Sequence, residues 1–571
     1  MRFLFVPLVN LLLLVRALLG LPFRLLAAPH RPTYVRFRLT GDPPYREHTR
    51  QQRPGLAALR GVGRKEPATV SSLESFRDAL ELLAADPKVK GIVLEVEELE
   101  IPPAKRDVLV KLLGDFRAAG KRVVAWAVST GNQGYQLMCA TDEVLLSPAG
   151  RLELVGFAAE ATALGEGLGR LGIKAHFFRR GEHKTAPELF THSHISDIQR
   201  QTLEALLDER YEELVDSVAR GRGRTPEEVR AWIDQGPYSA KRALEAGLVD
   251  GLCSEVDLPE RLGMKTEEED EEEGLEPFPV YRARLPWPPV SWRRLRPRPR
   301  LAVVPVTGMI VPGKGGAAPL GSRLAGSDSV VKAIRAAGRD RRARAMVLYV
   351  ASPGGSALAS ELILEAVQRV AKKKPVIAFV DRVAASGGYM AALGAKEIWT
   401  TPHAVVGSIG VYAGKFDASE LLERLGVHRE LITRGESAGI FSPTRGFTEH
   451  EQRTMELEVE ETYQAFLEHV AKARGRTKEE IHARAEGRVY SGQRALEAGL
   501  VDRLAGYEEA CRRALELAKV PAERFDIILY GARDKRFSLL KLLLGGSHAG
   551  VFAFCPTAWS LEGFGGGERF E

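Results

Sequence analysis

Cysteine is scarce in this sequence. Four cysteines, Cys139, Cys253, Cys511 and Cys555, are spread over 571 residues, and no two of them form a CxxC pair. Zinc ribbons, thioredoxin-type redox motifs and disulfide frameworks all require closely spaced cysteines. The spacing therefore argues against these three classes, and it leaves the redox compartment of the protein open.

The sequence also lacks a long hydrophobic run. Its most apolar stretch, Phe3–Val15, has about 13 residues, whereas a helix that spans a bilayer needs about 20. Arg16 and Arg24 interrupt its continuation, and no acidic residue occurs before Asp42. The overall composition, with 44% hydrophobic and 27% charged residues, argues against a polytopic membrane protein. We expect residues 1–30 to contact membrane lipid as an uncleaved signal anchor, an interfacial amphipathic helix or a cleaved signal peptide.

Neither sign of charge dominates. The 81 lysines and arginines exceed the 75 aspartates and glutamates by 6, and so small an excess argues against a general nucleic-acid-binding surface. Charge is concentrated instead where an acidic block, Glu267–Glu273, precedes a segment rich in proline, arginine and tryptophan that ends at Arg300. Prolines and repelling like charges cannot build a packed core. We predict a charged linker over residues 263–300.

The strongest pattern in the sequence is an internal repeat. The nine residues RALEAGLVD occur at Arg242–Asp250 and again at Arg494–Asp502, a displacement of 494 − 242 = 252 positions. The same displacement relates GRTPEE, which begins at Gly223, to GRTKEE, which begins at Gly475. Chance does not supply such identity, so we infer a tandem duplication.

The duplication predicts the domain organisation and the fold class. We expect one copy over residues 55–262 and a second over residues 301–515, which leaves residues 516–571 as a tail. Within each copy, short β-branched runs such as GIVLEV and AMVLYV alternate with stretches of helical periodicity. This alternation is typical of α/β architecture with buried parallel strands.

Equivalent positions in the two copies differ in chemical capability. The second copy has the glycine-containing segment Ser352–Ser356 after a predicted strand, whereas the first copy has acidic and branched residues there. Ser386 of the second copy is equivalent to Asn132 of the first, so one copy alone has the hydroxyl. Conversely, Lys184 of the first copy is equivalent to Ala438 of the second. The two copies therefore divide a serine and a lysine between them.

A serine and a lysine suffice for nucleophilic catalysis. A serine hydroxyl is a weak nucleophile until a base removes its proton, and a desolvated lysine serves as that base. Ser386 precedes Gly387 and a helical stretch, and a helix N-terminus favours developing negative charge. Backbone N–H groups of Gly354 and Gly355 are candidates for an oxyanion hole. We expect Gly387 to belong to the same oxyanion and substrate-binding site.

Four motifs together resemble one known family. They are SPGGS at Ser352–Ser356, AASGGY at Ala384–Tyr389, GSIGV at Gly407–Val411 and HKTAPE at His183–Glu188. They are similar to the motifs of signal peptide peptidase A of the long, duplicated bacterial type, in serine peptidase family S49. The resemblance extends over about residues 55 to 515. It implies a ClpP/crotonase-like fold in each copy and a membrane-anchored serine protease.

The resemblance also implies partners and a location. The family forms dome-shaped tetramers and degrades signal peptides that remain in the membrane after cleavage. We therefore expect a homo-oligomer, a hydrophobic peptide substrate and membrane lipid bound by the N-terminal segment. The expected location is the bacterial inner membrane, with the catalytic body in the periplasm. No cofactor, metal or nucleic acid is expected.

Site residues follow from the resemblance motif by motif. The serine of AASGGY makes Ser386 the nucleophile, and the lysine of HKTAPE makes Lys184 the general base. The serine of GSIG makes Ser408 the partner that holds the lysine amine. Two positions depart from the family pattern, since His183 stands where an aromatic residue is usual and Thr185 replaces a serine. Neither departure removes the base.

Other interpretations stay open at this point. A Ser/His triad would use His183, His403 or His428 as its base, although the first copy supplies no matching aspartate motif. A crotonase-like enzyme acting on coenzyme A thioesters would share the fold but need an acidic catalytic residue, and a non-catalytic membrane scaffold would need neither group. The favoured reaction is hydrolysis of a hydrophobic peptide through an acyl-enzyme. The sequence does not say whether the lysine and the serine meet within one chain or between chains.

Overall fold

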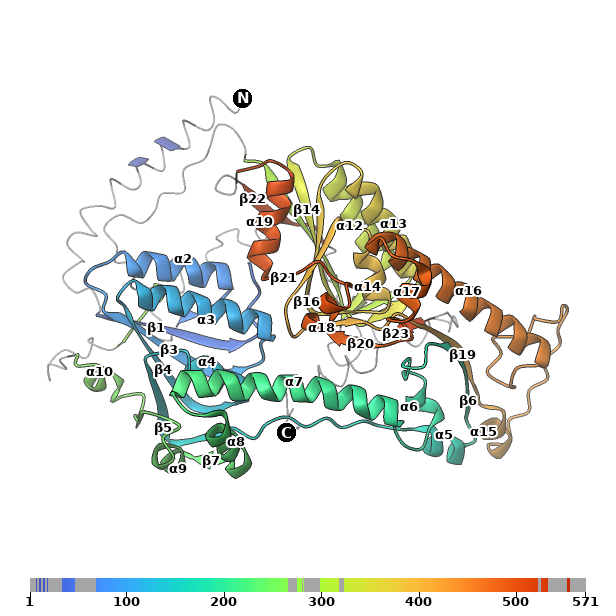
Figure 1. Ribbon diagram of the computed structural model, residues 1–571, viewed down its shortest axis with the longest axis horizontal. Coiled ribbons are helices and arrows are strands. Elements are labelled where there is room, and N and C mark those ends of the chain that lie inside the picture. The colour runs from blue at the N-terminus through green and yellow to red at the C-terminus, as the bar shows by residue number, and fades with distance from the viewer. Residues whose placement is uncertain are drawn as a thin grey trace. The chain divides into compact units, whose positions relative to one another are not determined.

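The computed structural model describes residues 33–46, 68–264, 275–279, 281, 298–317, 323–521, 525–531 and 552–554, together with six single residues between 7 and 18. The chain divides into two compact units (Figure 1). Unit 1 comprises Met1–Phe157 and Arg210–Pro297, and unit 2 comprises Ala158–Glu209 and Arg298–Glu571.

Unit 1 is built on an eight-stranded sheet in the order β2-β1-β3-β4-β5-β7, in which β8 pairs with β5 and β9 pairs with β1. Strands β1, β3, β4 and β5 pair in parallel, whereas β7 is antiparallel to β5. Residues Gly91–Val96 of β3 are all buried, as expected for a parallel strand covered on both faces. The strands are β1 (Tyr34–Gly41), β2 (Ala68–Thr69), β3 (Gly91–Leu99), β4 (Arg122–Gly131), β5 (Glu143–Glu153), β7 (Tyr238–Ser239), β8 (Gly251–Leu252) and β9 (Glu276–Pro277).

Helices cover both faces of this sheet. The hydroxyl of Ser72 caps the first helix, whose Phe76 packs edge-on against Phe37 of β1 with ring centroids 5.2 Å apart. On the other face, Leu258 packs in one buried cluster with Trp126 of β4. The helices are α2 (Leu73–Ala84), α3 (Pro103–Ala118), α4 (Asn132–Met138), α8 (Pro226–Gln235), α9 (Ala240–Glu245) and α10 (Leu258–Arg261). Helix α7 (Asp197–Arg222) begins in unit 2 and ends in unit 1.

Unit 2 contains a second sheet of this kind. Its order is β20-β18-β16-β14-β10-β22, with β17 beside β16 and β21 beside β17. Strands β10, β14 and β16 pair in parallel, and they bring Val303, Val347 and Ile377 side by side. The strands are β10 (Arg300–Thr307), β14 (Ala343–Ser352), β16 (Val376–Ala385), β17 (Glu397–Thr400), β18 (Val405–Gly407), β20 (Val489–Ser491), β21 (Arg503–Leu504) and β22 (Asp526–Leu529).

A smaller mixed sheet completes the strands of unit 2. Its order is β12-β13-β11-β15-β23-β19-β6, and β6 is antiparallel to β19 along seven residue pairs. Strand β6 comes from the first sequence copy, whereas the other strands come from the second copy and the tail. The strands are β6 (Lys174–Arg180), β11 (Met309–Val311), β12 (Gly315–Ala317), β13 (Arg323–Gly326), β15 (Gly354–Ser356), β19 (Val411–Asp417) and β23 (Phe552–Phe554).

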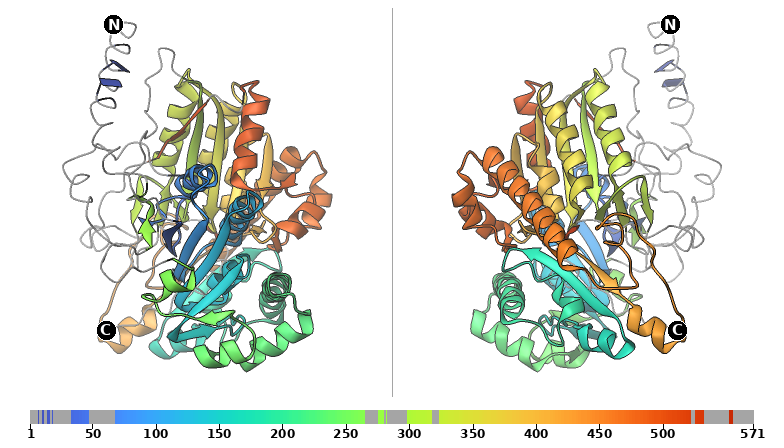
Figure 2. Two further views of the ribbon diagram at one scale, coloured as in Figure 1. Left: turned by 90° about the vertical axis from the view of Figure 1, so that its left-hand side faces the viewer. Right: turned by 90° about the vertical axis from the view of Figure 1, so that its right-hand side faces the viewer.

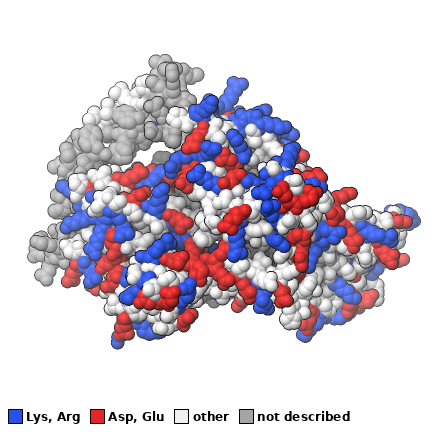
Figure 3. All heavy atoms as spheres, in the orientation of Figure 1, with Lys and Arg blue, Asp and Glu red and all other residues white. Residues whose placement is uncertain are grey.

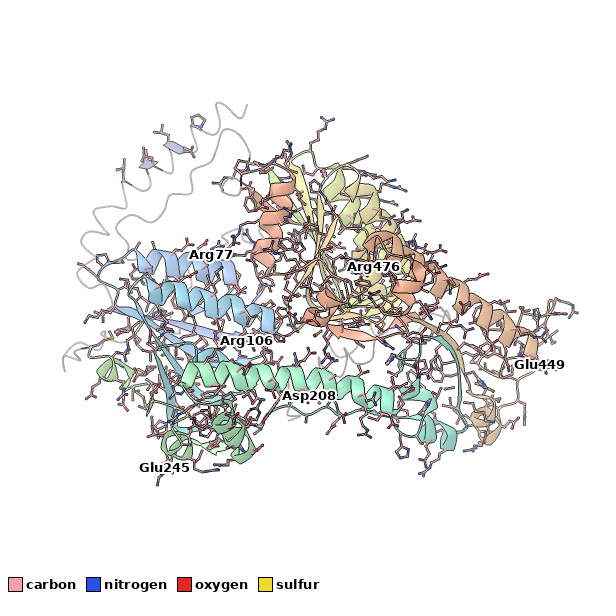
Figure 4. The ribbon with its side chains drawn as sticks, viewed as in Figure 1. Arg77, Arg106, Asp208, Glu245, Glu449 and Arg476 are labelled. Atoms are coloured by element: carbon pink, nitrogen blue, oxygen red, sulfur yellow. The ribbon has the colours of Figure 1, made fainter. Side chains whose placement is uncertain are left out.

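Helices also cover both faces of the larger sheet of unit 2 (Figure 2). Leu348 of β14 lies in the core cluster with residues of α12 and α13, whereas Tyr349 of the same strand contacts Tyr507 of α19. Figure 4 labels Glu449, where α16 begins after the capping residue Thr448. The helices are α5 (Gly165–Leu171), α6 (Glu188–Thr191), α12 (Ser327–Arg339), α13 (Ala357–Ala371), α14 (Gly387–Ala392), α15 (Ser419–Arg424), α16 (Glu449–Arg474), α17 (Lys478–His482), α18 (Gly492–Glu497) and α19 (Tyr507–Leu517).

Charges of both signs share the surface. On the face in Figure 3, lysine and arginine side chains are interspersed with aspartate and glutamate side chains. Several form ion pairs within one unit, such as Arg222 with Asp250 at 2.8 Å and Arg474 with Asp502 at 2.7 Å. This mixed surface agrees with the small net charge of +6.

The predicted α/β class is confirmed, and the mixed sheet is an addition that the alternation of strands and helices did not predict. In the part of the chain that the structure describes, no helix has the length and apolar character that crossing a bilayer requires. Residues 1–30, predicted to contact a membrane, lie almost entirely outside the described residues, as do most of residues 263–300 and 516–571.

The compact units do not coincide with the sequence copies. Residues 158–209 belong to the first copy by sequence, but they pack within unit 2 and supply β6 and α6 there. Lys184 lies in this segment, in the loop between β6 and α6. A side chain of the first copy is thereby built into the unit that carries Ser386.

Candidate active site

A sharp turn between β16 and α14 holds Ser386. The residue has φ 53° and ψ −119°, a conformation that non-glycine residues keep only where the surroundings enforce it. Its backbone N–H donates to the carbonyl oxygen of Gly407 at 2.7 Å. Ser386 occupies the N-cap position of α14, but its hydroxyl makes no capping hydrogen bond. The side chain is therefore left for other chemistry.

The two glycines after Ser386 are required by packing. A Cβ on Gly387 would lie 2.3 Å from the hydroxyl oxygen of Ser360, and one on Gly388 would lie 2.4 Å from the carbonyl oxygen of Ser352. Both distances are far shorter than any normal contact. The SGG sequence thus lets the turn sit tightly against β14 and α13, with Ser386 fully buried.

Lys184 reaches Ser386 from the loop between β6 and α6. Its side chain is 1% exposed, and its Nζ lies 2.7 Å from the Oγ of Ser386. The same Nζ donates to the hydroxyl and to the carbonyl oxygen of Ser408, at 3.0 and 3.1 Å. The two residues therefore meet within one chain.

Ser408 occupies a second strained turn. It follows β18, has φ 52°, and is 2% exposed. Its backbone N–H donates to the carbonyl oxygen of Arg488 at 2.6 Å, which holds the turn in place. Both of its oxygens consequently point to the Lys184 amine. The structure thus brings together all three residues that the motifs assigned to catalysis.

The environment of the lysine amine favours its neutral form. Burial destabilises a charged ammonium. This amine lies within hydrogen-bonding distance of the hydroxyls of Ser386 and Ser408 and of the carbonyl oxygen of Ser408. A neutral amine has two N–H donors and one lone pair. Two donors toward Ser408 and a lone pair toward the Ser386 hydroxyl would satisfy all three contacts. The geometry is therefore that of a base poised to accept the Ser386 proton.

The glycines predicted to form an oxyanion hole lie in and beside β15. Gly354 and Gly355 have φ 107° and 147°, which favour glycine. The N–H of Gly354 donates to the hydroxyl of Ser352 at 3.2 Å and is thus engaged. A Cβ on Gly387 would lie 3.4 Å from the nitrogen of Gly355, so Gly355 lies next to the serine turn. Gly355, which also pairs with Ile310 of β11 and with Ala553 of β23, and Gly387 are the glycines that lie together at the serine turn.

The structure does not favour His183 or His428 as the alternative base. His428 is exposed, whereas Ser386 is fully buried. Burial, and then the charge of Arg488, lowers the pKa of His183, although Glu182 and Glu486 oppose the shift. The base that hydrogen-bonds the Ser386 hydroxyl is the amine of Lys184.

Several residues around the lysine were not predicted. Arg179 donates to the carboxylate of Glu188 at 2.8 Å and to the carbonyl oxygen of Lys184 at 3.4 Å. The ion pair of Arg179 and Glu188 thereby joins the two ends of the lysine loop. Ser352 anchors the glycine segment through a hydrogen bond to the carbonyl oxygen of Gly308 at 2.7 Å. The serine of SPGGS and the glutamate of HKTAPE were visible signals, whereas no motif of the sequence analysis included Arg179.

Comparison with known proteins assigns the family. A family profile described as Peptidase family S49 matches residues 115–267 and 368–521, one match in each sequence copy. The chain belongs to peptidase family S49. It is a serine protease of the duplicated type, similar to Protease 4 of bacteria.

The similarity to whole relatives extends over most of the chain. Protease 4 of Salmonella typhi is 31% identical over 467 residues, which cover 80% of this chain and 74% of that protein. Protease 4 of Haemophilus influenzae is 28% identical over 523 residues, which cover 89% of this chain and 82% of that protein. The chloroplastic serine protease SPPA of Arabidopsis thaliana is 29% identical over 458 residues, covering 79% and 67%.

Among solved structures, a point mutant of ClpP1 from Listeria monocytogenes is similar over 37% of this chain and 94% of that chain. The sequence identity is 13% and the TM-score is 0.23. A likeness of this size carries no argument about the fold or the site.

Proposed function

We propose that this S49 serine protease uses Ser386 and Lys184 as a catalytic dyad to hydrolyse hydrophobic peptides, in particular remnant signal peptides. The observation that carries the proposal is the 2.7 Å contact between the buried lysine Nζ and the buried serine Oγ. In the first copy Asn132 stands at the position equivalent to Ser386, and in the second copy Ala438 stands at the position equivalent to Lys184. Each copy therefore supplies one of the two groups.

The proposed reaction proceeds through an acyl-enzyme. Neutral Lys184 accepts the hydroxyl proton of Ser386 while Oγ attacks the carbonyl carbon of the scissile bond. Backbone N–H groups of Gly355 and Gly387 stabilise the oxyanion that forms. The lysine then gives its proton to the leaving amine, and the C–N bond breaks. Water, deprotonated by the same lysine, attacks the acyl-serine ester. The C–Oγ bond then breaks, Oγ takes the proton back from the lysine, and the acid product leaves.

Ser408 keeps the amine aimed during these steps. Its hydroxyl and carbonyl oxygens hold two N–H groups of Lys184, so the third direction of the nitrogen faces Ser386. A flexible lysine side chain has many rotamers, and fixing one of them removes the entropic cost of orientation from the reaction. The proposal therefore gives Ser408 an orienting role rather than a chemical one.

The substrate is proposed to bind as an extended strand beside β15. The chain itself places a strand there, because Phe552–Phe554 runs antiparallel to Gly354–Ser356 and also pairs with Tyr412 of β19. Main-chain pairing of this kind accepts many sequences as long as the peptide is extended. The position beside the glycine segment supports a peptide, rather than a compact acyl thioester, as the substrate.

The remaining parts of the proposal rest on the family. We propose that each copy has a ClpP/crotonase-like fold and that the chain assembles as a homotetramer. We further propose that residues 1–30 attach it to the bacterial inner membrane, with the catalytic body in the periplasm. The small net charge and the absence of a strong excess of basic residues support a substrate other than nucleic acid.

The test compares hydrolysis of a fluorogenic peptide that contains Val-Phe-Ala-Phe, the sequence at 551–554, by wild-type protein and by two variants. Ser386→Ala and Lys184→Ala should each lower kcat/KM by more than about 10³-fold, because each removes one half of a unit that acts together. Lys374→Ala serves as the control, since this lysine binds the carbonyl oxygens of Ala337 and Asp340 instead. Full activity in either dyad variant would refute the mechanism.

A further inference from the structure

One short segment of the second copy contacts both the Lys184 loop and the Ser408 turn. The carbonyl oxygen of Glu486 accepts the backbone N–H of His183 at 2.7 Å, next to Lys184 in the chain. Two residues later, the carbonyl oxygen of Arg488 accepts the N–H of Ser408 at 2.6 Å. The segment therefore links the lysine loop to the turn that holds the lysine amine.

The side chain of Glu486 adds a second contact to the lysine loop. Its Oε2 accepts the backbone N–H of Glu182 at 3.0 Å. The other carboxylate oxygen, Oε1, faces the hydroxyl of Tyr463 at 3.4 Å and the Nε2 of His482 at 3.2 Å. The carboxylate is thus fixed from α16 and α17 while it holds the loop.

The backbone of Glu486 is strained. Its φ is 54°, in the left-handed region where glycine would be cheaper. The next residue, Gly487, has φ 77°, and a Cβ on it would lie 2.4 Å from the nitrogen of Lys184. The segment therefore approaches the lysine backbone as closely as a chain allows. The close contact with Lys184 requires the glycine at position 487. Position 486 is also strained, yet it holds a glutamate.

We propose that Glu486 is a positioning residue for the general base. It acts through its carboxylate, which fixes the loop so that the Nζ of Lys184 stays within reach of Ser386 and stays buried. This inference rests on the proposed function, because it assigns Lys184 the role of base. Glu486 itself touches neither the substrate nor the reacting atoms.

Charged groups around the loop define what a pH profile would report. Residues 181–187 form the loop. The charged or titratable groups around the loop and Glu486 include Arg179 on β6, Glu188 on α6, Tyr463 on α16, His482 on α17 and Arg488 between α17 and β20. Arg180 of β6 pairs with Glu460 of α16 beside them. The loop itself also contains the ionisable side chains of Glu182 and His183. A change of charge at Glu486 and a loss of positioning must therefore be separated by the choice of variants.

The test compares Glu486→Gly with Glu486→Gln in the full-length protein. Glycine keeps the backbone carbonyl and relieves the strain at φ, but it removes the acceptor for Glu182. Glutamine keeps an acceptor oxygen and removes only the charge. Lys519→Gly is the matched control, since Lys519 also has φ 54° and is exposed.

The expected result is a loss of kcat in Glu486→Gly of about 10- to 100-fold, the effect of a displacement of about 1 Å in a catalytic group. The midpoint of kcat/KM should also move to higher pH, because water that reaches a loosened amine favours its charged form. Glu486→Gln should keep kcat within about threefold of wild type. Lys519→Gly should change neither quantity, and the thermal midpoint of both glycine variants should agree within a few degrees.

Three results would overturn the inference. One is a wild-type kcat and midpoint in Glu486→Gly. Another is the same shift in the glycine and glutamine variants, which would mean that only the charge matters. The third is a matching loss in Lys519→Gly. Hydrolysis that survives Ser386→Ala would instead contradict the proposed function, so the two failures are distinguishable.

Discussion

The two S49 copies of the chain share their scaffolding bonds. Tyr135 of the first copy donates its hydroxyl proton to the carbonyl oxygen of Leu248, and Tyr389 of the second donates to that of Leu500, both at 2.6 Å. The acceptors lie within the repeated RALEAGLVD sequence. The longest identity in the sequence therefore preserves the packing of a short helix against the sheet, and it says nothing about catalysis.

The same repeat ends in a second shared contact. Asp250 and Asp502 each bind an arginine at the end of a long helix, Arg222 and Arg474 respectively. Each aspartate also accepts a backbone N–H from a neighbouring strand at 2.7 to 2.8 Å. These bonds join a long helix to the sheet edge in both copies. Identity between copies marks the parts that any such copy needs.

Differences between the copies fall at the residues of the proposed active site. Asn132 replaces the serine in the first copy. Its side-chain amide donates to the carbonyl oxygen of Gly156 at 2.5 Å and accepts the backbone N–H of Val155 at 3.1 Å, so it binds the loop after β5. Its counterpart Ser386 instead meets an amine. Leu154 replaces Ser408 and is fully buried. At these two positions the first copy therefore has a loop-binding asparagine and a buried leucine where the second copy has serines.

The sharpest way to break this comparison is to exchange Ser386 and Asn132. Ser386→Asn removes the nucleophile and should lower kcat/KM by more than about 10³-fold. Asn132→Ser removes two hydrogen bonds and should cost about 1–2 kcal/mol in unit 1 without affecting turnover. Steady-state kinetics and thermal unfolding measure the two effects. A comparable loss of turnover in both variants would remove the division of labour.

The second test replaces Ser408 by alanine and by leucine, the residue at the equivalent position 154 of the first copy. In Ser408→Ala the Lys184 amine keeps the carbonyl oxygen but loses the hydroxyl, so kcat should fall by about 10- to 100-fold. Ser408→Leu should lose more, because a branched side chain cannot fit beside a fully buried amine. Activity in both should still rise with pH, since the base works only when it is neutral. Unchanged kcat in Ser408→Ala would mean that the carbonyl alone orients the base.

The sequence predicted which side chains lie together better than it predicted the architecture. Ser386, Lys184 and Ser408 were found from motifs and from differences between copies, and they do lie within hydrogen-bonding distance. The alternation of strands and helices also gave the correct α/β class, because parallel strands buried on both faces have a distinct composition. The motifs and the strand-helix alternation are local features, so they can be recognised in the sequence.

The sequence did not predict how the segment that carries Lys184 is placed beside Ser386. Residues 158–209 leave the unit of their own copy and add β6 to the smaller sheet of the other unit. Their contacts join positions as far apart in the chain as Lys184 and Ser386, which no local pattern encodes. The support from Glu486 was missed for a similar reason, because a glutamate at φ 54° looks like any surface glutamate in a sequence. Backbone strain becomes visible only in three dimensions.

The smallest expected effect tests the shared half of the comparison. Tyr135→Phe and Tyr389→Phe each remove one buried hydroxyl and leave a buried carbonyl without its donor, which costs about 1–3 kcal/mol. For units of this size, about 1 kcal/mol lowers the thermal midpoint by about 2–4 °C. Because the two bonds have equal length and both tyrosines are fully buried, the two variants should lower the stability of their own units by similar amounts. Thermal unfolding followed by hydrogen exchange resolves the units. A large effect in one copy alone would show that the repeated sequence stabilises the copies unequally, so that identity between them reflects more than scaffolding.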